Sequence, residues 1–313
     1  EYESNIMYAQ TFDHYQKLID FEPTVIITDM HPSFHIENHV IKRFPNTKTV
    51  SLQHHKAHYY AILFEHNLLE SEEPILGIIW DGIGYGEDEN IWGGEFFEYT
   101  SGTMGRKYHI NYFPYLLGDK MALQPRIAAL AFTNQNEYLR SKIKGKFSDK
   151  EWDLYKKILA FPQKTVTSSI GRIFDAMSAL LNLCDINQYE GQAAILLEQK
   201  ASEYFTVNRM KGITQCYTFT FQDGKILFDK FLSELTFDIA QNESVTFIAA
   251  KFHVSLIYLI IKIAKPYSKI AFSGGVFQNA ILVDLAIEHL SEDHKLYFHN
   301  QLPPNDENIS VGQ

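Results

Sequence analysis

The chain has 313 residues, of which 45% are hydrophobic and 21% are charged, and this composition predicts a compact folded protein and excludes a disordered one. Its net charge of -10 disfavours a nucleic acid as the main partner, because nucleic-acid affinity depends on Lys and Arg that neutralise phosphates. The longest apolar stretch, Val254–Ala264, contains Lys262 and is shorter than the roughly 20 residues that span a bilayer, so neither a transmembrane helix nor a membrane partner is expected.

The two ends of the chain and its cysteines predict where the protein works. The acidic start at Glu1 is not followed by the apolar stretch of a secretory signal. Cys184 and Cys216 form no CxxC pair, which is typical of a reducing cytoplasm and gives no cysteine zinc site. We therefore expect a cytoplasmic protein. Because the sequence stops abruptly at Ser310–Gln313, we also expect a domain of a longer protein.

The secondary structure is predicted from the spacing of apolar residues. Short runs rich in β-branched and aromatic residues predict strands at Val25–Thr28, Thr49–Leu52, Ile75–Trp80, Ile91–Tyr99 and Ile270–Phe272. Apolar residues three and four apart predict helices over 11–20, 55–68, 169–183, 191–204, 244–264 and 277–290. Strands and helices alternate at both ends of the chain, which predicts α/β layers with ligand sites at strand ends. The polar segment Arg140–Lys150 is expected to be a solvated connection.

The run His54-His55-Lys56-Ala57-His58 follows the second predicted strand. If it opens a helix, His54 and His58 lie one turn apart on one side, a spacing that places two imidazoles on one metal ion. The alternative is a set of polar residues at a helix start, and thirteen histidines make accidental pairs common.

The turn Asp81-Gly82-Ile83-Gly84-Tyr85-Gly86 follows the strand Ile75–Trp80. Its glycines favour close approach of backbone amides to an anion, and the Asp81 carboxylate is a candidate cation ligand. The alternative is a tight hairpin into the next strand.

Two later segments also carry candidate ligand groups. Ser273-Gly274-Gly275 lies between a strand and a helix, where free amides favour phosphate, although an ordinary strand-to-helix turn has the same form. Asp306, in Pro303-Pro304-Asn305-Asp306, precedes an expected helix start at Ile309, and by itself it indicates an N-cap.

The segments around residues 167–175 and 189–194 give weaker signals. Thr167-Ser168-Ser169 supplies cap-type hydroxyls to a helix that carries Arg172 and Asp175, three residues apart, which predicts a surface ion pair. Glu190, in Tyr189-Glu190-Gly191, is expected either to bind a ribose hydroxyl or to favour the helix dipole.

Seven segments in this order resemble the C-terminal domain of the hydrogenase-maturation carbamoyltransferases, the HypF family: QHHKAH, IIWDGIGYGEDENIWGGEF, LLGDKMALQPRIAAL, TSSIGRIFDAMSALL, YEGQAAILLE, FSGGVFQN and PPNDENISVGQ. The resemblance runs from about Asp29 to the last residue. It implies an α/β, two-lobed actin-like ATPase (ASKHA) fold with a nucleotide cleft between the lobes, similar to the threonylcarbamoyl-adenosine synthase subunit. The expected lobes are about 1–135 and 136–313.

The resemblance also implies a set of site residues. The family's divalent metal ligands correspond to His54, His58, Asp81 and Asp306. The residues that match its nucleotide-binding positions are Gly82, Gly84, Glu190, Gly191, Ser273, Gly274, Gly275 and Asn279. Lys120 and Arg126 match a motif expected to contact the carbamoyl or phosphate group and are the candidate catalytic residues. Imidazole and carboxylate ligands together suit iron(II) or zinc, and the sequence does not choose between them.

The implied reaction is transfer of a carbamoyl group from carbamoyl-adenylate, an ATP-derived intermediate made by an upstream domain, to the C-terminal cysteine thiol of the partner HypE. The product is the precursor of the cyanide ligand of nickel-iron hydrogenase. The alternatives are O-carbamoylation of a small molecule and a non-catalytic metal-holding or docking module. A role like that of the tRNA-modifying relative is disfavoured by the motif wording and the acidic charge.

Three positions depart from the family pattern. Lys56 replaces a third histidine, Gln124 stands where a glutamate usually precedes the Pro-Arg pair, and Glu307-Asn308 replaces a Gly-Gly after Asp306. None of the three removes an expected metal ligand, but the last is expected to alter the loop that presents Asp306.

Overall fold

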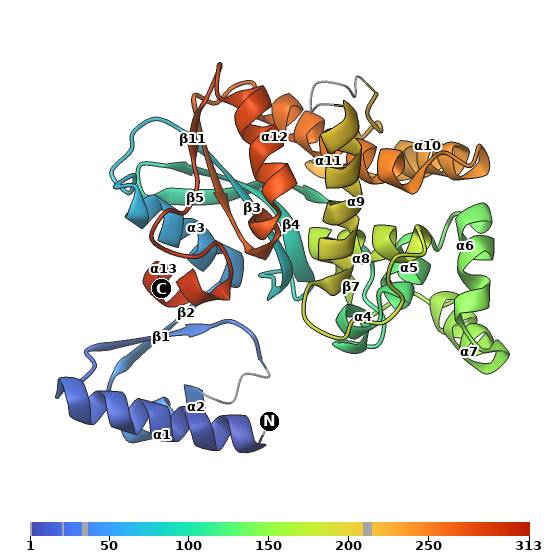
Figure 1. Ribbon diagram of the computed structural model, residues 1–313. Coiled ribbons are helices and arrows are strands. Elements are labelled where there is room, and N and C mark those ends of the chain that lie inside the picture. The colour runs from blue at the N-terminus through green and yellow to red at the C-terminus, as the bar shows by residue number, and fades with distance from the viewer. Residues whose placement is uncertain (1, 21, 33–36, 209–214) are drawn as a thin grey trace.

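The computed structural model describes residues 2–20, 22–32, 37–208 and 215–313 (Figure 1). The α-helices are α1 (Tyr2–Ile19), α2 (Glu37–Arg43), α3 (His54–Glu65), α4 (Lys120–Leu123), α5 (Pro125–Phe132), α6 (Glu137–Ile143), α7 (Asp149–Leu159), α8 (Ile170–Leu180), α9 (Gln192–Asn208), α10 (Asp229–Ala240), α11 (Val245–Ala264), α12 (Ala280–Leu290) and α13 (Ile309–Gly312). The short 3-10 helices are η1 (Lys144–Lys146), η3 (Gly275–Gln278) and η4 (Asp306–Asn308). The strands are β1 (Val25–Asp29), β2 (Lys48–Leu52), β3 (Ile75–Tyr85), β4 (Ile91–Thr100), β5 (Thr103–Ile110), β6 (Phe113–Pro114), β7 (Val166–Thr167), β8 (Thr220–Gln222), β9 (Lys225–Leu227), β10 (Lys269–Ser273) and β11 (Lys295–Tyr297).

The described strands form two sheets. The parallel strands β1 and β2 make a small sheet, which lies with α1 and α2 at the lower end of the molecule in Figure 1. The nine-stranded sheet has the order β11-β10-β3-β4-β5-β9-β8, and β6 and β7 are attached beside β4. In its centre, β3 runs parallel to β10 and antiparallel to β4.

The division between the two sheets lies between β2 and β3. Strands on both sides of the lobe boundary predicted near residue 135 share one sheet: β3, β4 and β5 precede residue 135, and β8 to β11 follow it. The two-lobe boundaries stay a prediction, but hydrogen bonding within this sheet favours an earlier boundary, before β3.

Strand β3 is buried on both faces, so its alternate residues enter two hydrophobic clusters. Ile75 and Ile79 pack in the cluster that includes Tyr59 of α3. Leu76 and Trp80 enter the larger cluster, to which α5, α8, α11 and α12 contribute. The carboxyl end of β3, where Asp81 lies, is therefore held from both sides.

The apolar helix α11 is a helix of the core. Within the described residues it is the one helix long and apolar enough to cross a membrane, but 78% of its most apolar window is buried inside the molecule. It packs against α9 and α12. The sequence-based expectation that the apolar residues here belong to a packed core agrees with this burial.

The predicted strands and helices are all present, but several differ in extent: for example, the helix predicted over 11–20 begins at Tyr2, and the one predicted over 277–290 is divided into η3 and α12. Strand β3 does not end at Trp80: it continues with an irregularity through the glycine segment to Tyr85 and pairs with β4, so the segment forms a hairpin, and its ligand-binding role stays a prediction. Arg140–Lys150 is not an open connection: it contains the end of α6, η1 and the start of α7. A capping box between Ser148 and Glu151 starts α7, which explains why this polar segment is helical.

Gly77 in β3 is required because Tyr59 occupies the space where its side chain would lie. A Cβ on Gly77 would come 2.5 Å from Tyr59 Cζ, whereas a Cβ on Gly105 in β5 would meet nothing within 4 Å. We expect Gly77→Ala to lower the free energy of unfolding by about 1–3 kcal/mol, since the core must shift. Gly105→Ala is the matched control, and denaturant unfolding measures both. Equal stability of the two variants would contradict this account of the packing.

Candidate metal centre

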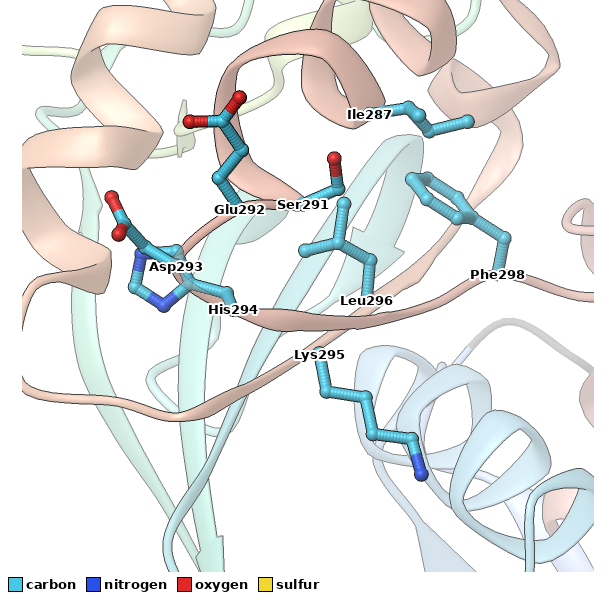
Figure 2. A pocket seen from close by; sticks show the side chains of 8 residues that line it. All are labelled: Ile287, Ser291, Glu292, Asp293, His294, Lys295, Leu296 and Phe298. Carbon is cyan, nitrogen blue, oxygen red and sulfur yellow. The ribbon is translucent and has the colours of Figure 1, made fainter.

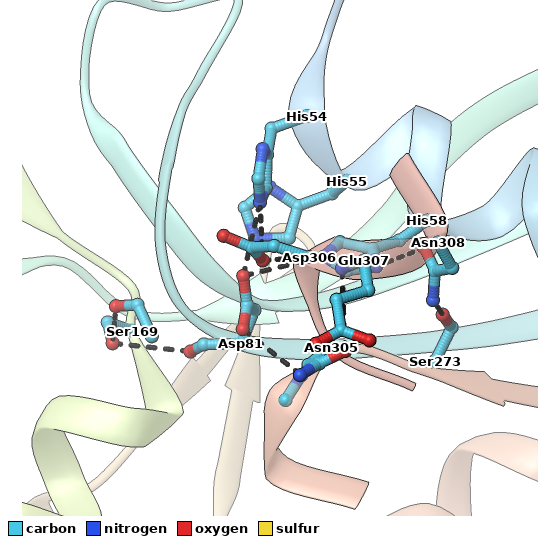
Figure 3. A network of polar contacts seen from close by, with 12 residues as sticks. His54, His55, His58, Asp81, Ser169, Ser273, Asn305, Asp306, Glu307 and Asn308 are labelled. Carbon is cyan, nitrogen blue, oxygen red and sulfur yellow. Dashed lines mark hydrogen bonds and ion pairs between the residues drawn. The ribbon is translucent and has the colours of Figure 1, made fainter. Parts of the chain in front are cut away.

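Three separate parts of the chain bring the predicted metal ligands together. The Gln53 side chain accepts a hydrogen bond from Lys56 N and so caps α3, which starts at His54 and places His54 and His58 one turn apart. Strand β3 supplies Asp81, and η4 supplies Asp306. Figure 3 shows the four side chains directed toward one another.

The distances among the four side chains suit a single metal ion. His54 Nε2 lies 3.2 Å from Asp81 Oδ2 and 3.5 Å from Asp306 Oδ1, and His58 Nε2 lies 3.6 and 3.5 Å from the same two oxygens. All four ligand atoms lie within 4.8 Å of one another. Tetrahedral zinc with bonds of about 2.0–2.1 Å holds its ligand atoms about 3.3 Å apart, so the set fits such an ion.

Hydrogen bonds on the far side of each imidazole fix which nitrogen faces the site. His54 Nδ1 lies 3.0 Å from Asp29 Oδ2, and His58 Nδ1 lies 2.9 Å from Asn308 Oδ1. Because a carboxylate or amide oxygen only accepts, each Nδ1 carries a proton and each Nε2 faces the carboxylates, where it donates when the imidazole is protonated and offers a lone pair to a metal ion when it is not. His58 Nε2 is buried and has no close hydrogen-bond partner: the Asp306 and Asp81 oxygens lie 3.5 and 3.6 Å away, long contacts that leave this nitrogen available to a cation.

The ionisation of the four groups in the metal-free chain reflects this crowding. Burial lowers the pKa of His54, but hydrogen bonds with Asp29, Asp306 and Asp81 outweigh burial and raise that pKa well above its usual range. The pKa of His58 is also raised, because hydrogen bonds with Asp306 and Asp81 outweigh burial. Hydrogen bonds from His54 and His58 lower the pKa of Asp306 to about 2. The carboxylates therefore favour a positive charge between them, which a metal ion supplies when it replaces the protons.

The predicted glycines have different surroundings. A Cβ on Gly84 would lie 2.4 Å from His55 Cε1 and 2.9 Å from His54 Cδ2, so this glycine makes room for the imidazoles. Gly274 has φ of 102° and lies against the carbonyl of Trp80. Gly275 N donates to Asp81 Oδ1 at 3.1 Å. Only Gly82 of these four has open space beside its Cα, so it is the glycine best placed to approach a phosphate.

The other predicted nucleotide-binding residues divide into buried and exposed ones. Ser273 Oγ contacts His299 Nε2 at 2.8 Å, and Asn279 caps α12 while its Nδ2 lies 3.0 Å from His253 Nε2. Glu190 and Gly191 are exposed, and Gly191 has a φ of 75°. Binding of nucleotide by any of these residues stays a prediction.

The two candidate catalytic residues contact the helical region of α7 rather than the four metal ligands. Arg126 Nη2 lies 2.9 Å from Glu151 Oε1, and its guanidinium lies over the ring of Phe147. Lys120 is exposed, and its Nζ lies 3.3 Å from Tyr155 OH. These contacts favour a role for Arg126 in holding α5 to α7, and a catalytic role for either residue stays a prediction.

The sequence predicted a surface ion pair between Arg172 and Asp175. The structure shows that this pair is largely buried. Arg172 Nε lies 2.7 Å from Asp175 Oδ2, and the two side chains are 12% and 3% exposed. Burial raises the pKa of Asp175 to about 6, although Arg172 opposes this shift. Helix α8 packs against α5 and α9, which covers the pair.

The sequence analysis missed Asp29 as a functional residue. It ends β1, and besides contacting His54 it accepts a hydrogen bond from His31 N at 2.8 Å. The available signal was a carboxylate directly after a predicted strand, the same signal that had identified Asp81.

A surface hollow of about 610 Å³ lies at the end of α12 and along β11 (Figure 2). Its lining residues are Ile287, Ser291, Glu292, Asp293, His294, Lys295, Leu296 and Phe298. None of them is a predicted site residue, so this hollow is not the predicted nucleotide cleft.

The raised histidine pKa values predict a pH dependence of stability in the metal-free chain. A group whose pKa is raised by folding stabilises the protein below its unfolded value, here 6.5, and that stability is lost as the pH rises through the folded value. We expect the melting temperature in a metal chelator to fall as the pH rises above 6.5, and to fall less in His54→Ala. The carboxylates act in the opposite direction, and their contribution is lost below about pH 4. If the melting temperatures of the two proteins fell equally with pH above 6.5, this prediction would be contradicted.

Gly84 gives a second prediction. In Gly84→Ala the new methyl group would displace His54 and His55, so we expect zinc affinity to fall by about ten-fold or more. Gly82→Ala adds a methyl group in open space and is the control. Competition with a chromogenic chelator measures both affinities, and unchanged binding by Gly84→Ala would count against the close packing of the imidazoles.

Comparisons with known proteins agree with the arrangement of the fold and the site. The family model described as "HypF Kae1-like domain" matches residues 1–65, and that described as "Carbamoyltransferase, Kae1-like Domain, second subdomain" matches residues 77–313. The chain is 34% identical to the carbamoyltransferase HypF of Synechocystis sp. over 98% of its own length and 42% of that protein. It is 28% identical to carbamoyltransferase HypF2 of Cupriavidus necator over 96% of its length and 40% of that protein.

Solved structures give the same result. The crystal structure of full-length HypF in its phosphate- and nucleotide-bound form superposes with a TM-score of 0.82 at 29% identity, covering 97% of this chain and 40% of that one. The HypF structure from T. kodakarensis superposes with a TM-score of 0.78 at 23% identity, covering 92% of this chain and 39% of that one, and supports the fold alone. The predicted α/β fold class of the actin-like type is confirmed. The chain spans about two fifths of the length of these relatives, and it belongs to the HypF carbamoyltransferase family as a Kae1-like domain.

Proposed function

We propose that this chain transfers a carbamoyl group from carbamoyl-adenylate to the thiol of the C-terminal cysteine of a HypE-like partner. The observation that carries the proposal is the cluster of two imidazoles and two carboxylates at an accessible edge of the sheet. Three ligands are buried, but the Asp306 side chain is 72% exposed, so a substrate can reach the cluster from that side. Membership of a carbamoyltransferase family, and a neighbour crystallised with phosphate and nucleotide, support this reading.

The proposed reaction exchanges one bond for another at the carbamoyl carbon. The partner thiol loses its proton, its sulfur attacks the carbonyl carbon, and the bond between that carbon and the phosphate oxygen breaks to release AMP. An iron(II) or zinc ion held by His54, His58, Asp81 and Asp306 would supply positive charge beside the departing phosphate. The chain itself supplies the position of the reactants, since its backbone at Gly82 is open beside Asp81.

The proposed nucleotide site lies along the segments that surround the cluster. Gly82 has open space for a phosphate, and the exposed Glu190 and Gly191 are available to a ribose. Ser273, Gly274 and Gly275 form the turn that reaches Asp81 from β10, so they line the same region even though their own groups are engaged locally. We expect Lys120, whose side chain is exposed, rather than Arg126 to be free to contact substrate.

The proposed reaction needs a carbamoyl-adenylate that another part of the protein makes. The relatives extend well beyond the region that this chain matches, which leaves room in them for an adenylate-forming domain. A reducing cytoplasm, where the partner cysteine stays a thiol, is the location that this chemistry requires.

Asp306 provides the test of the proposal, because its exposed side chain can be removed without opening the core. The assay uses metal-loaded protein, synthetic carbamoyl-adenylate and a peptide that ends in cysteine. Removing an outer hydrogen-bond partner of a metal ligand lowers activity roughly 10- to 100-fold, and we expect Asp306→Ala, which removes a ligand itself, to lower the rate of carbamoyl transfer by more than this. The exposed neighbour Glu307 gives the matched control Glu307→Ala, which should stay near wild type. Mass spectrometry of the peptide measures the transfer.

The outcomes separate the alternatives. A wild-type chain that binds metal but never modifies the peptide would contradict thiol transfer. Equal rates for Asp306→Ala and the wild type would remove Asp306 from the reacting site.

A further inference from the structure

We propose that Asn308 is a positioning residue for the metal ligand His58, held in place by a buried relay of hydrogen bonds through Ser273 and His299 to Glu65. The inference rests on the proposed metal site, but it does not depend on which group the enzyme transfers. Asn308 is completely buried, and it lies beside His58 although 250 residues separate them in the chain. Figure 3 shows Asn308 between His58 and Ser273.

The orientation of the Asn308 amide is fixed by its own contacts. Its Nδ2 donates to the carbonyl of Pro303 at 2.9 Å, which an amide oxygen in that place could not do. Its Oδ1 therefore faces His58 Nδ1, at 2.9 Å, and accepts that proton. The consequence is that His58 is held with the Nε2 lone pair directed toward Asp81 and Asp306, the form that a metal ion requires.

A second layer of hydrogen bonds supports this amide. Asn308 Nδ2 lies 3.4 Å from Ser273 Oγ and 3.3 Å from His299 Nε2. Ser273 Oγ donates to His299 Nε2 at 2.8 Å, because His299 Nδ1 is protonated and lies 2.6 Å from Glu65 Oε2. Every donor in the relay thus has an acceptor, and the relay ends on a carboxylate.

The order serine, histidine, glutamate matches that of a nucleophilic triad, but burial argues for a supporting role. Ser273 is fully buried, and the His299 side chain is 1% exposed, so a substrate carbonyl has no approach to the hydroxyl. The other end of the relay is instead Asn308, which contacts the proposed metal ligand His58.

The relay also ties the Asp306 loop to the helix that carries both histidines. Glu65 ends α3, and its Oε1 accepts hydrogen bonds from Asn300 N at 2.8 Å and Gln301 N at 2.6 Å. Helix α3 therefore supplies two ligands at its start. At its end, Glu65 hydrogen-bonds the segment that leads to Asp306.

Asn308 stands where the family pattern has the second glycine after the aspartate. A glycine has no side chain to accept the proton of His58 Nδ1, so the contact is a property of this chain rather than of the motif. The departure that was expected to disturb the loop instead gives His58 an additional partner.

The role of Asn308 can be tested by measuring the zinc affinity of this 313-residue chain in competition with a chromogenic chelator. Asn308→Leu keeps much of the volume and removes the acceptor, and we expect its zinc dissociation constant to rise about ten-fold or more. Asn308→Asp keeps an acceptor oxygen toward His58 but loses the hydrogen bond to the Pro303 carbonyl, so its zinc affinity should lie between those of the wild type and the leucine variant. Glu307→Ala, on the same turn, should match the wild type.

The absorption spectrum of the cobalt(II)-loaded protein should change in Asn308→Leu and stay the same in Glu307→Ala, because it reports ligand geometry directly.

Each failure has its own signature. A wild-type chain that binds no zinc would overturn the proposed metal site itself. Zinc binding by Asn308→Leu within about two-fold of wild type would overturn only the role of the Asn308 oxygen. If circular dichroism shows that Asn308→Leu does not fold, Asn308→Ala takes its place with the same ten-fold expectation.

Discussion

The two imidazole nitrogens lie 3.2–3.6 Å from the oxygens of two carboxylates, an arrangement that is stable only if positive charge lies between them. This constraint explains the organisation of the surrounding structure. Helix α3 is capped by Gln53 so that its first turn presents His54 and His58 together. The buried strand β3 fixes Asp81 from both faces of the sheet, and Glu65 fixes the loop that brings Asp306. The rigid parts of the fold thus oppose the repulsion that the site creates.

The sequence predicted the main elements well, because long amphipathic helices and strands rich in β-branched residues leave a clear spacing. It predicted poorly where the signal is not local. The glycines after Trp80 indicated a turn, yet β3 continues to Tyr85 because pairing with β4 outweighs the backbone cost of glycine. The two-residue strands β6 and β7 are too short to show any period, and they form through pairing with distant segments: β7 pairs with β4, and β6 pairs with β7.

The site was predicted in the same uneven way. His54, His58 and Asp81 followed from residue spacing, whereas Asp306 came only from the resemblance, because an isolated Asp before a helix is an ordinary cap. Asp29, Glu65 and Asn308 were not predicted at all, since each acts on a residue from a distant part of the chain. Gly84 was predicted to approach a phosphate, and this stays a prediction; what the structure adds is that its Cα lies against the imidazoles. Residue types alone do not distinguish a glycine that admits a ligand from one that admits a side chain.

The hydrogen bond between Asp29 and His54 joins the small β1–β2 sheet to a site whose carboxylates belong to the large sheet and its C-terminal extension. A displacement of the small sheet would therefore move Asp29, whose contact with Nδ1 fixes the orientation of the His54 ring. By thermodynamic reciprocity, a metal ion that prefers one orientation of His54 also prefers one placement of that sheet, by the same free energy. If a metal ion binds at the proposed centre, its affinity and the placement of the small sheet would therefore be coupled through Asp29 and His54.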